Sequence, residues 1–171
     1  MDNLILPLRV KVSKKKYFSL NLNMYRNGHY LVLNTAKSEF KRIISPQIKK
    51  LNRFEIIRIT YTLFPRNQHK MDVSNVCSVV DKFFCDALVE LGKLEDDNYD
   101  FIPEIIYQFG FVDKTNPRVE ALIEPIQLNQ PKPKDYKMKI ILNNNDLHDI
   151  LLNHAINQYS ISDKSNIEIQ V

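Results

Sequence analysis

The spacing of apolar and polar positions along the chain predicts both strands and helices. Alternation with a period of two residues, typical of half-buried strands, occurs in residues 5–12, 30–33, 54–63, 102–109 and 119–123. Apolar spacing of three and four residues, typical of amphipathic helices, occurs in residues 35–51 and 75–91. This pattern predicts an α+β fold that has a mixed or antiparallel sheet and two main helices.

The helix expected at residues 75–91 has the clearest apolar stripe in the chain. The stripe consists of Val76, Val80, Phe83, Ala87 and Leu91. Gly92 follows it, at the position where a helix commonly ends in a left-handed residue. In the first helix Pro46 is expected to kink or divide the chain. Asn27-Gly28 is expected to form a turn that tolerates positive φ.

Proline content marks a boundary after residue 124. Residues 125–137 contain three prolines and are interpreted as an extended, Pro-rich linker. This linker separates a main domain, residues 1–124, from a small C-terminal extension, residues 138–171, with a strand-helix-strand pattern. Because so small a unit cannot build a sufficient core alone, we expect it to pack on the main domain or on a second subunit.

Composition narrows the class of protein. The chain has 171 residues, 44% of them hydrophobic, which is enough for a folded core and argues against general disorder. Its apolar runs are shorter than the roughly 20 residues that span a bilayer, and we expect neither a membrane partner nor a secretory signal. Cys77 and Cys85 are too far apart in one helix for a disulfide and lack the partners of a zinc site. We therefore expect a reducing, cytoplasmic location.

Charge is distributed unevenly along the chain. Residues 1–70 hold 15 Lys and Arg against 3 Asp and Glu, whereas residues 71–171 hold 9 against 17, so a balance of +12 precedes one of −8. A basic part followed by an acidic cluster is typical of a protein that binds a polyanion through metal ions. Unevenly scattered surface charge is the alternative, and charge alone leaves both interpretations open.

Acidic residues gather around the helix expected at residues 75–91. Asp72 precedes this helix, Asp81 lies on it, and Asp96 and Asp97 follow it. Mg²⁺ prefers a few carboxylate oxygens with open water positions, so acids from separate segments can form a site for phosphodiester hydrolysis. Lys82 would then contact the phosphate or stabilise developing charge.

A purely structural interpretation of the same residues stays open. Asp72 would cap the N-terminus of the helix, where a negative charge is favourable. Lys82 and Asp86, four residues apart, would form an ordinary surface pair, and Asp96-Asp97 would be a turn.

Three motifs resemble the signature of the RusA family of Holliday-junction resolvases. They are Asp72-Val-Ser-Asn75, then Lys82-Phe-Phe-Cys-Asp86-Ala-Leu88, then Gly92 followed by Asp96-Asp97. The family has D-x-D-N, K-x-x-x-D-A-L, and a glycine before a D-D pair. The resemblance covers roughly residues 5–124 and leaves the C-terminal extension outside it. The chain departs from the family at Ser74, where the second acid is missing, and by about four extra residues before Lys82, close to one helical turn.

The resemblance implies a homodimeric endodeoxyribonuclease. Members of the family bind four-way DNA junctions and nick two opposed strands, using Mg²⁺ held by aspartates, and Mn²⁺ is the other ion expected to serve. Carried over to this chain, Asp72 and Asp97 would be metal ligands, Asp96 would lie adjacent, and Lys82 would be the catalytic lysine. Such proteins are often encoded by phages, which implies the cytoplasm of a bacterial host.

Ser74 raises the question of which residue supplies the missing acid. Asp81 shares a helix face with Ser74 and Ser78, so we expect it to serve as a metal ligand and catalytic residue instead. Without such a replacement, the chain would be a branched-DNA binding protein that does not cleave. A general interaction protein with a solvated acidic loop is the third hypothesis.

Basic residues before the acidic helix are the candidates for DNA contact. They are Lys14, Lys15, Lys16, Arg26, Arg66, His69 and Lys70. Because phosphate contacts dominate such binding, we expect affinity to fall steeply with salt. Tyr17, Phe18 and Tyr25 interleave with the first of these residues and either stack on exposed bases or pack in the core.

Overall fold

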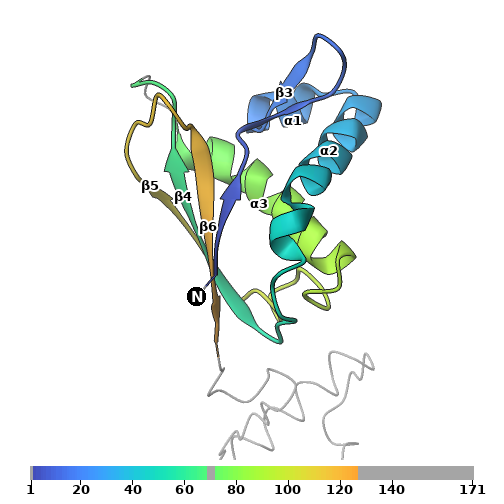
Figure 1. Ribbon diagram of the computed structural model, residues 1–171, viewed down its shortest axis with the longest axis vertical. Helices are drawn as coiled ribbons and strands as arrows, with labels where there is room; N and C mark the ends of the chain where they lie inside the picture. Colours follow the sequence, from blue (N-terminus) through green and yellow to red (C-terminus); the bar gives the residue numbers. More distant parts are fainter. Residues whose placement is uncertain (1, 69–71, 127–171) are drawn as a thin grey trace, which may run out of the picture. The chain divides into compact units, whose positions relative to one another are not determined.

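The structure, a computed structural model, describes residues 2–68 and 72–126, which belong to one compact unit. Its elements are β1 (Asp2–Leu6), β2 (Arg9–Lys11), β3 (Tyr17–Ser19), α1 (Leu22–Asn27), α2 (Tyr30–Ile48), β4 (Ile57–Phe64), α3 (Val73–Glu90), β5 (Glu104–Phe109) and β6 (Arg118–Pro125) (Figure 1). The expected linker from residue 127 onward and the C-terminal extension lie outside the described residues. The mixture of helices with a mixed sheet confirms the predicted α+β class.

Four strands form the central sheet in the order β1-β6-β4-β5. β5 runs parallel to β4, whereas β6 is antiparallel to both of its neighbours, β4 and β1. α3 connects the parallel pair, since parallel strands need a long crossover and a helix supplies one. The helices α2 and α3 lie on the same face of this sheet (Figure 1).

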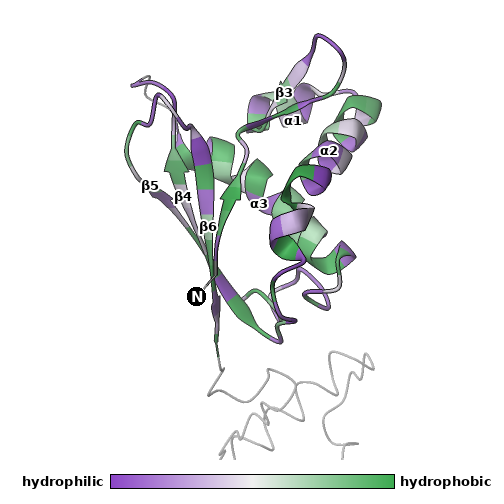
Figure 2. Cartoon of the chain, viewed as in Figure 1, coloured by the Kyte–Doolittle hydropathy of each residue, from purple (hydrophilic) through white to green (hydrophobic). Residues whose placement is uncertain are grey.

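The core lies between the sheet and these helices. Ile57, Ile59, Tyr61 and Leu63 of β4 are fully buried, and the residues between them are half-buried. Such alternation is typical of a sheet with one covered face, and Figure 2 shows hydrophobic and hydrophilic residues alternating along β6. The buried residues that α3 contributes are Val76, Cys77, Val79, Val80, Phe83, Phe84, Cys85, Ala87 and Leu88.

α3 is the helix that the sequence predicts at residues 75–91. It begins two residues earlier than predicted, at Val73, and ends one residue earlier, at Glu90. Gly92 follows with a φ of 68°, the left-handed conformation expected of a glycine after a helix. In the described ranges neither α3 nor any other helix is long and apolar enough to cross a membrane.

Two strand predictions are wrong. The strand expected at residues 5–12 is in fact β1 and β2, which belong to different sheets, because Pro7 lacks a backbone N–H and cannot continue a ladder. Residues 30–33 are the first turn of α2, which His29 caps by accepting a hydrogen bond from the Leu31 amide at 3.3 Å. Four alternating residues are too few to outweigh the helical spacing that follows them.

Two expectations about helix-breaking residues also change. Pro46 does not divide α2, because it lies near the end of the helix, where its missing N–H removes one bond of the last turn. Gly28 has a φ of −76°, so no left-handed conformation requires it. Space requires it instead, since a Cβ there would come 2.8 Å from the Met24 carbonyl oxygen. The preceding helix α1 and the strand β3 have no counterpart in the sequence predictions.

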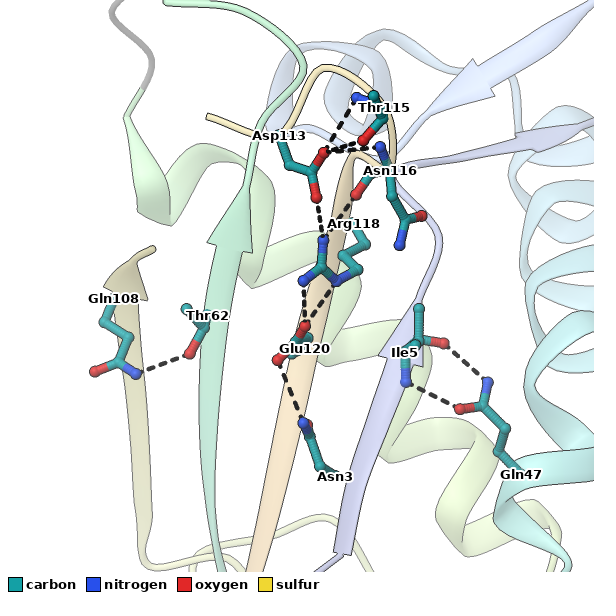
Figure 3. Close-up of polar contacts among 10 residues, drawn as sticks. All are labelled: Asn3, Ile5, Gln47, Thr62, Gln108, Asp113, Thr115, Asn116, Arg118 and Glu120. Atoms are coloured by element: carbon teal, nitrogen blue, oxygen red, sulfur yellow. Dashed lines mark hydrogen bonds and ion pairs between the residues drawn. The ribbon is translucent and has the colours of Figure 1, made fainter. Parts of the chain in front are cut away.

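The Gln47 side chain of α2 forms two hydrogen bonds with the backbone of the edge strand β1. The carboxamide oxygen of Gln47 accepts a hydrogen bond from the Ile5 amide, and its nitrogen donates one to the Ile5 carbonyl, each at 2.9 Å (Figure 3). The carboxamide therefore occupies the position that a further strand would take on this edge.

Candidate functional site

Asp72 caps the N-terminus of α3. Its Oδ1 accepts hydrogen bonds from the Ser74 amide at 3.0 Å and from the Ser74 hydroxyl at 2.8 Å. Ser74, at the position where the family has a second acid, therefore orients the first one. The Asp72 side chain is exposed. The capping interpretation is confirmed, and a cap of this kind still leaves Oδ2 with acceptor capacity.

Asn75, the last residue of the first motif, connects α3 to the short helix α1. Its side-chain oxygen accepts a hydrogen bond from the Leu22 amide at 3.1 Å, across 53 positions of sequence. Leu22 is the first residue of α1, whose opening amides have no partner within the helix. Asn75 thus positions α1 beside the beginning of α3.

Asp81 points toward the sheet. Its Oδ1 accepts hydrogen bonds from the Tyr61 hydroxyl at 2.8 Å and the Cys85 thiol at 3.2 Å, and its Oδ2 accepts one from the Tyr107 hydroxyl at 2.9 Å. The carboxylate is half-buried. The two tyrosine bonds fix the middle of α3 against β4 and β5, a structural role that spacing alone did not reveal.

Burial and the Asp81 charge keep the donors of this cluster protonated. Burial raises the pKa of the Tyr61 hydroxyl well above its ordinary value, and it raises the pKa of the Tyr107 hydroxyl as well. Burial first, and the Asp81 carboxylate second, raise the pKa of the Cys85 thiol. All three groups therefore remain hydrogen-bond donors at neutral pH.

Asp86, the acid of the second motif, joins two helices. Its carboxylate lies 2.9 Å from the Lys37 ammonium of α2, and Glu90 pairs with both Lys37 and Lys41. The pair expected between Lys82 and Asp86 is not present among the ion pairs of the described chain. Lys82 is exposed and lines a cavity of about 270 Å³ between the helices.

Asp96 and Asp97 lie in the exposed loop after α3. Asp96 accepts hydrogen bonds from the Asp97 amide at 2.8 Å and from the Asn98 side chain at 2.7 Å, so it does form the turn proposed for it. The charge of Asp97 contributes to the raised pKa of the Cys85 thiol, to which Asp81 is also bonded. The charges of Asp97 and Asp81 therefore both act on the Cys85 thiol.

Asp72 and the loop of Asp96 and Asp97 lie at opposite ends of α3. The helix has 18 residues, so it spans about 27 Å between its ends. Asp72 is the N-cap of α3, which begins near the end of β4 (Figure 1), and Asp96 lies in the loop after the other end of the helix. Within residues 2–68 and 72–126 no three His, Cys, Asp or Glu side chains are arranged to hold a metal ion. The acids of the signature do not converge within one chain.

The candidate DNA-contacting residues are exposed. Lys14, Lys15 and Lys16 occupy the turn of the β2–β3 hairpin, Arg26 lies in the last turn of α1, and Arg66 follows β4. His69 and Lys70 lie outside the described residues. Among the aromatic residues, Phe18 is fully buried and Tyr17 is 51% exposed. Tyr25 packs edge-on against Phe83 with ring centroids 6.2 Å apart, so it belongs in part to the core.

Comparison with protein-family models gives no match, and comparison with curated proteins gives none either. The resemblance to the RusA family therefore rests on the sequence motifs alone.

Two basic residues that sequence reasoning missed lie beside Arg66. Arg9 and Lys114 line the same cleft as Arg66, although they are 57 and 48 positions away from it in sequence. Nothing in the local sequence marks them, because only the folded chain brings β2, the end of β4 and the β5–β6 loop together.

Proposed function

We propose that this protein is a Mg²⁺-dependent, structure-selective endonuclease that nicks branched DNA. The three motifs that resemble the RusA signature lie on α3 and on the loops at its two ends, and basic residues lie close to the end where α3 begins. Catalysis would use Asp72, Asp96, Asp97 and Lys82.

One observation carries this proposal: the signature acids Asp72, Asp96 and Asp97 take no part in the ion pairs of the described residues. The ion pairs among described residues occupy eight carboxylates, namely Glu39, Asp86, Glu90, Glu95, Glu104, Asp113, Glu120 and Glu124. Asp72, Asp96 and Asp97 are exposed and take no part in them. Of the four signature acids, only Asp86 forms an ion pair among the described residues, and that pair joins α2 to α3.

The carboxylate oxygens of the signature aspartates are ligands of the type that Mg²⁺ prefers. Mg²⁺ binds through one or two carboxylates together with waters and substrate phosphate oxygens, and exposed aspartates supply such oxygens. When bound, the ion would polarise the scissile phosphate and lower the pKa of a bound water. Asp81 fits less well, because two hydroxyls and a thiol already occupy its carboxylate.

The separation of the acids supports a dimeric site. Asp72 and Asp97 lie at opposite ends of α3, so one chain alone does not bring them to a common ion. A two-fold axis that sets the α3 helices of two protomers antiparallel would place Asp72 of one protomer near Asp97 of the other. Such an arrangement yields two equivalent sites, as paired cuts in opposed strands require.

Lys82 would act on the phosphate rather than on the metal. Its side chain is exposed and has no ion-pair partner among the described residues, so its ammonium can approach a DNA phosphate. A positive charge placed there stabilises the charge that develops on the phosphoryl oxygens.

A nicking assay on variants tests the proposal. We expect Asp97→Asn to abolish Mg²⁺-dependent nicking of a synthetic four-way junction, because the amide is a far weaker metal ligand than the carboxylate. Asp100→Asn is the matched control, since Asp100 is exposed in the same loop but outside the signature. Equal activity in both variants would contradict the assignment of Asp97.

Ser74 favours a second function, namely binding of branched DNA without cleavage. The hydroxyl that stands in place of an acid is bonded to Asp72 and brings no charge to the site. Tight, salt-dependent junction binding without nicking under any divalent metal would establish this function instead.

A further inference from the structure

A cleft at the end of the sheet where α3 begins is lined by α3 itself and by three other segments, which carry its basic residues. The β2–β3 hairpin contributes Arg9, the end of β4 contributes Arg66 and Asn67, and the β5–β6 loop contributes Lys114 and Thr115. The cleft encloses a volume of about 480 Å³, which lies in the range that holds ligands larger than a single phosphate ion.

The charge of this cleft has one sign. Arg9, Arg66 and Lys114 line it together with apolar, hydroxyl and amide residues, and none of the lining residues is acidic. None of these three cations belongs to an ion pair of the described residues, whereas Lys37, Arg58 and Arg118 are all paired. Three unneutralised cations around one cavity attract an anion and repel a cation.

The wall that carries Lys114 is held rigidly. Asp113 accepts hydrogen bonds from the Thr115 amide and hydroxyl, at 3.1 and 2.8 Å, and from the Asn116 amide at 2.9 Å (Figure 3). Its other oxygen accepts from the Arg118 guanidinium at 2.8 Å. The Asn116 amide, followed by the Thr115 hydroxyl, lowers the pKa of Asp113 to about 2, so the loop remains bonded at neutral pH.

The same loop is joined to the Arg66 wall. The Asp113 amide donates to the Pro65 carbonyl at 2.9 Å, and Arg118 lies over the Phe64 ring at 4.2 Å from its centroid. Gly110 allows the backbone of this loop to lie close to the Phe64 ring, because a Cβ at this position would come 2.5 Å from the ring. Two of the three basic walls therefore keep a fixed spacing, and a preformed arrangement binds with a smaller loss of conformational entropy.

The cleft lies next to a candidate catalytic acid. Val76 lines it and stands one helical turn after Asp72. In the β2–β3 hairpin the Arg9 guanidinium lies over one face of the Tyr17 ring, 5.1 Å from its centroid, and this ring is half exposed. Cations together with an exposed aromatic ring are typical of surfaces that follow a nucleic acid strand.

We propose that this cleft binds the sugar–phosphate backbone of one DNA strand, with Arg9, Arg66 and Lys114 neutralising its phosphates beside Asp72. The identity of the polyanion rests on the proposed function, whereas the location of the site rests on the cleft itself. Arg9 and Lys114 thereby join Arg66 as DNA-contacting residues.

The test compares two double variants of equal charge. Arg9→Gln/Lys114→Gln removes two cations from the cleft, and Lys49→Gln/Lys50→Gln removes two exposed lysines from the far end of α2. Binding of a fluorescent four-way junction is measured by anisotropy over a series of salt concentrations. Losing two phosphate contacts should reduce the slope of log K against log salt by about 1.8, and the control should keep the wild-type slope.

Further arms make each outcome decisive. Arg9→Lys/Lys114→Arg should restore binding, and equal urea midpoints would show that all variants are folded. If the wild type binds and nicks junctions but the cleft variant shows the same salt dependence of binding as the control variant, the cleft is not the binding site. The proposed function would then remain intact. The wild-type protein could instead fail to bind junctions and bind a single-stranded oligonucleotide through Arg9 and Lys114. That result would support the cleft as a binding site and overturn the proposed function. If inorganic phosphate displaced the oligonucleotide when both were present at the same concentration of negative charges, the cleft would be a site for small anions. That result would overturn the proposal that it binds a DNA strand.

Discussion

At the scale of single residues, Asp81 illustrates how an acid on a helix face serves the fold. Its carboxylate holds the Tyr61 and Tyr107 hydroxyls of two neighbouring strands and the Cys85 thiol of its own helix. Buried hydroxyls need a partner, and a charged acceptor gives stronger bonds than a neutral one. The sequence places Asp81 on the face of Ser74 and Ser78, but the pairing of β4 with β5 that delivers the tyrosines cannot be derived from that spacing.

We predict that Asp81→Asn destabilises the protein by about 2 kcal/mol, because the amide nitrogen would face a hydroxyl donor and leave it without an acceptor. Urea unfolding measures this loss, with Asp100→Asn as the exposed control. If Asp81→Asn kept wild-type stability but lost Mg²⁺-dependent nicking, Asp81 would be a metal ligand in place of the acid missing at Ser74.

We predict that stability falls at alkaline pH through the buried thiols. Burial, followed by the Asp81 charge, raises the pKa of Cys77 from 9.0 to about 12. The folded state therefore keeps a proton that the unfolded state releases, so stability is constant below about pH 9 and then falls by about 1.4 kcal/mol per pH unit for this group. Tyr61 and Cys85, whose pKa values are also raised, act in the same direction.

Urea unfolding across the alkaline range checks this slope. Cys77→Ala should decline less steeply than the wild type, because one proton fewer is released on unfolding. A stability that stays level up to about pH 11 would contradict the burial of these groups.

At the scale of elements, α2 and α3 are joined by ion pairs on one side of their contact. Lys37 reaches Asp86 at 2.9 Å and Glu90 at 3.5 Å, and Lys41 also pairs with Glu90. Partly exposed pairs of this kind contribute little individually. Their arrangement matters because it assigns Asp86 to the packing of helices, although the motif that contains it resembles a catalytic signature.

We predict that Asp86→Asn lowers stability by at most about 1 kcal/mol, and less at high salt, while nicking continues at the wild-type rate. Urea unfolding at two ionic strengths and a junction assay measure the two effects. Loss of nicking with unchanged stability would instead place Asp86 in the active site.

The elements that could be predicted from sequence are those with long, one-sided burial. α3 and β4 are covered on one face along their whole length, so their apolar periods of about 3.6 and two residues are complete. α1 and β3 were missed because they are short, and α1 has no buried residue. The first turn of α2 was assigned to a strand because Tyr30 and Leu31, which are exposed, carry no helical signal.

The candidate site was predicted in part. Asp72, Asp96 and Asp97 are recognisable by their spacing around a helix, and the structure leaves all three exposed. Arg9 and Lys114 could not be found, because a cleft formed by distant segments leaves no local pattern.

At the scale of the whole molecule, the proposed dimer would bring together the acids that lie at the two ends of α3 in one chain. We predict complementation between two inactive variants, Asp72→Asn and Asp97→Asn. A heterodimer of the two would contain one site with both substitutions and one site with none, so co-expressed chains should regain nicking of one strand. Continued inactivity of the mixture would show that each site is built within a single chain.

The most direct measurement follows all four strands of a synthetic four-way junction, each labelled in turn, on a denaturing gel. With Mg²⁺ we expect nicks at symmetric positions in two opposed strands, none in linear duplex, and loss of both nicks with EDTA or with Asp97→Asn. A junction that is bound tightly and remains intact with every divalent metal would contradict the proposed nuclease function.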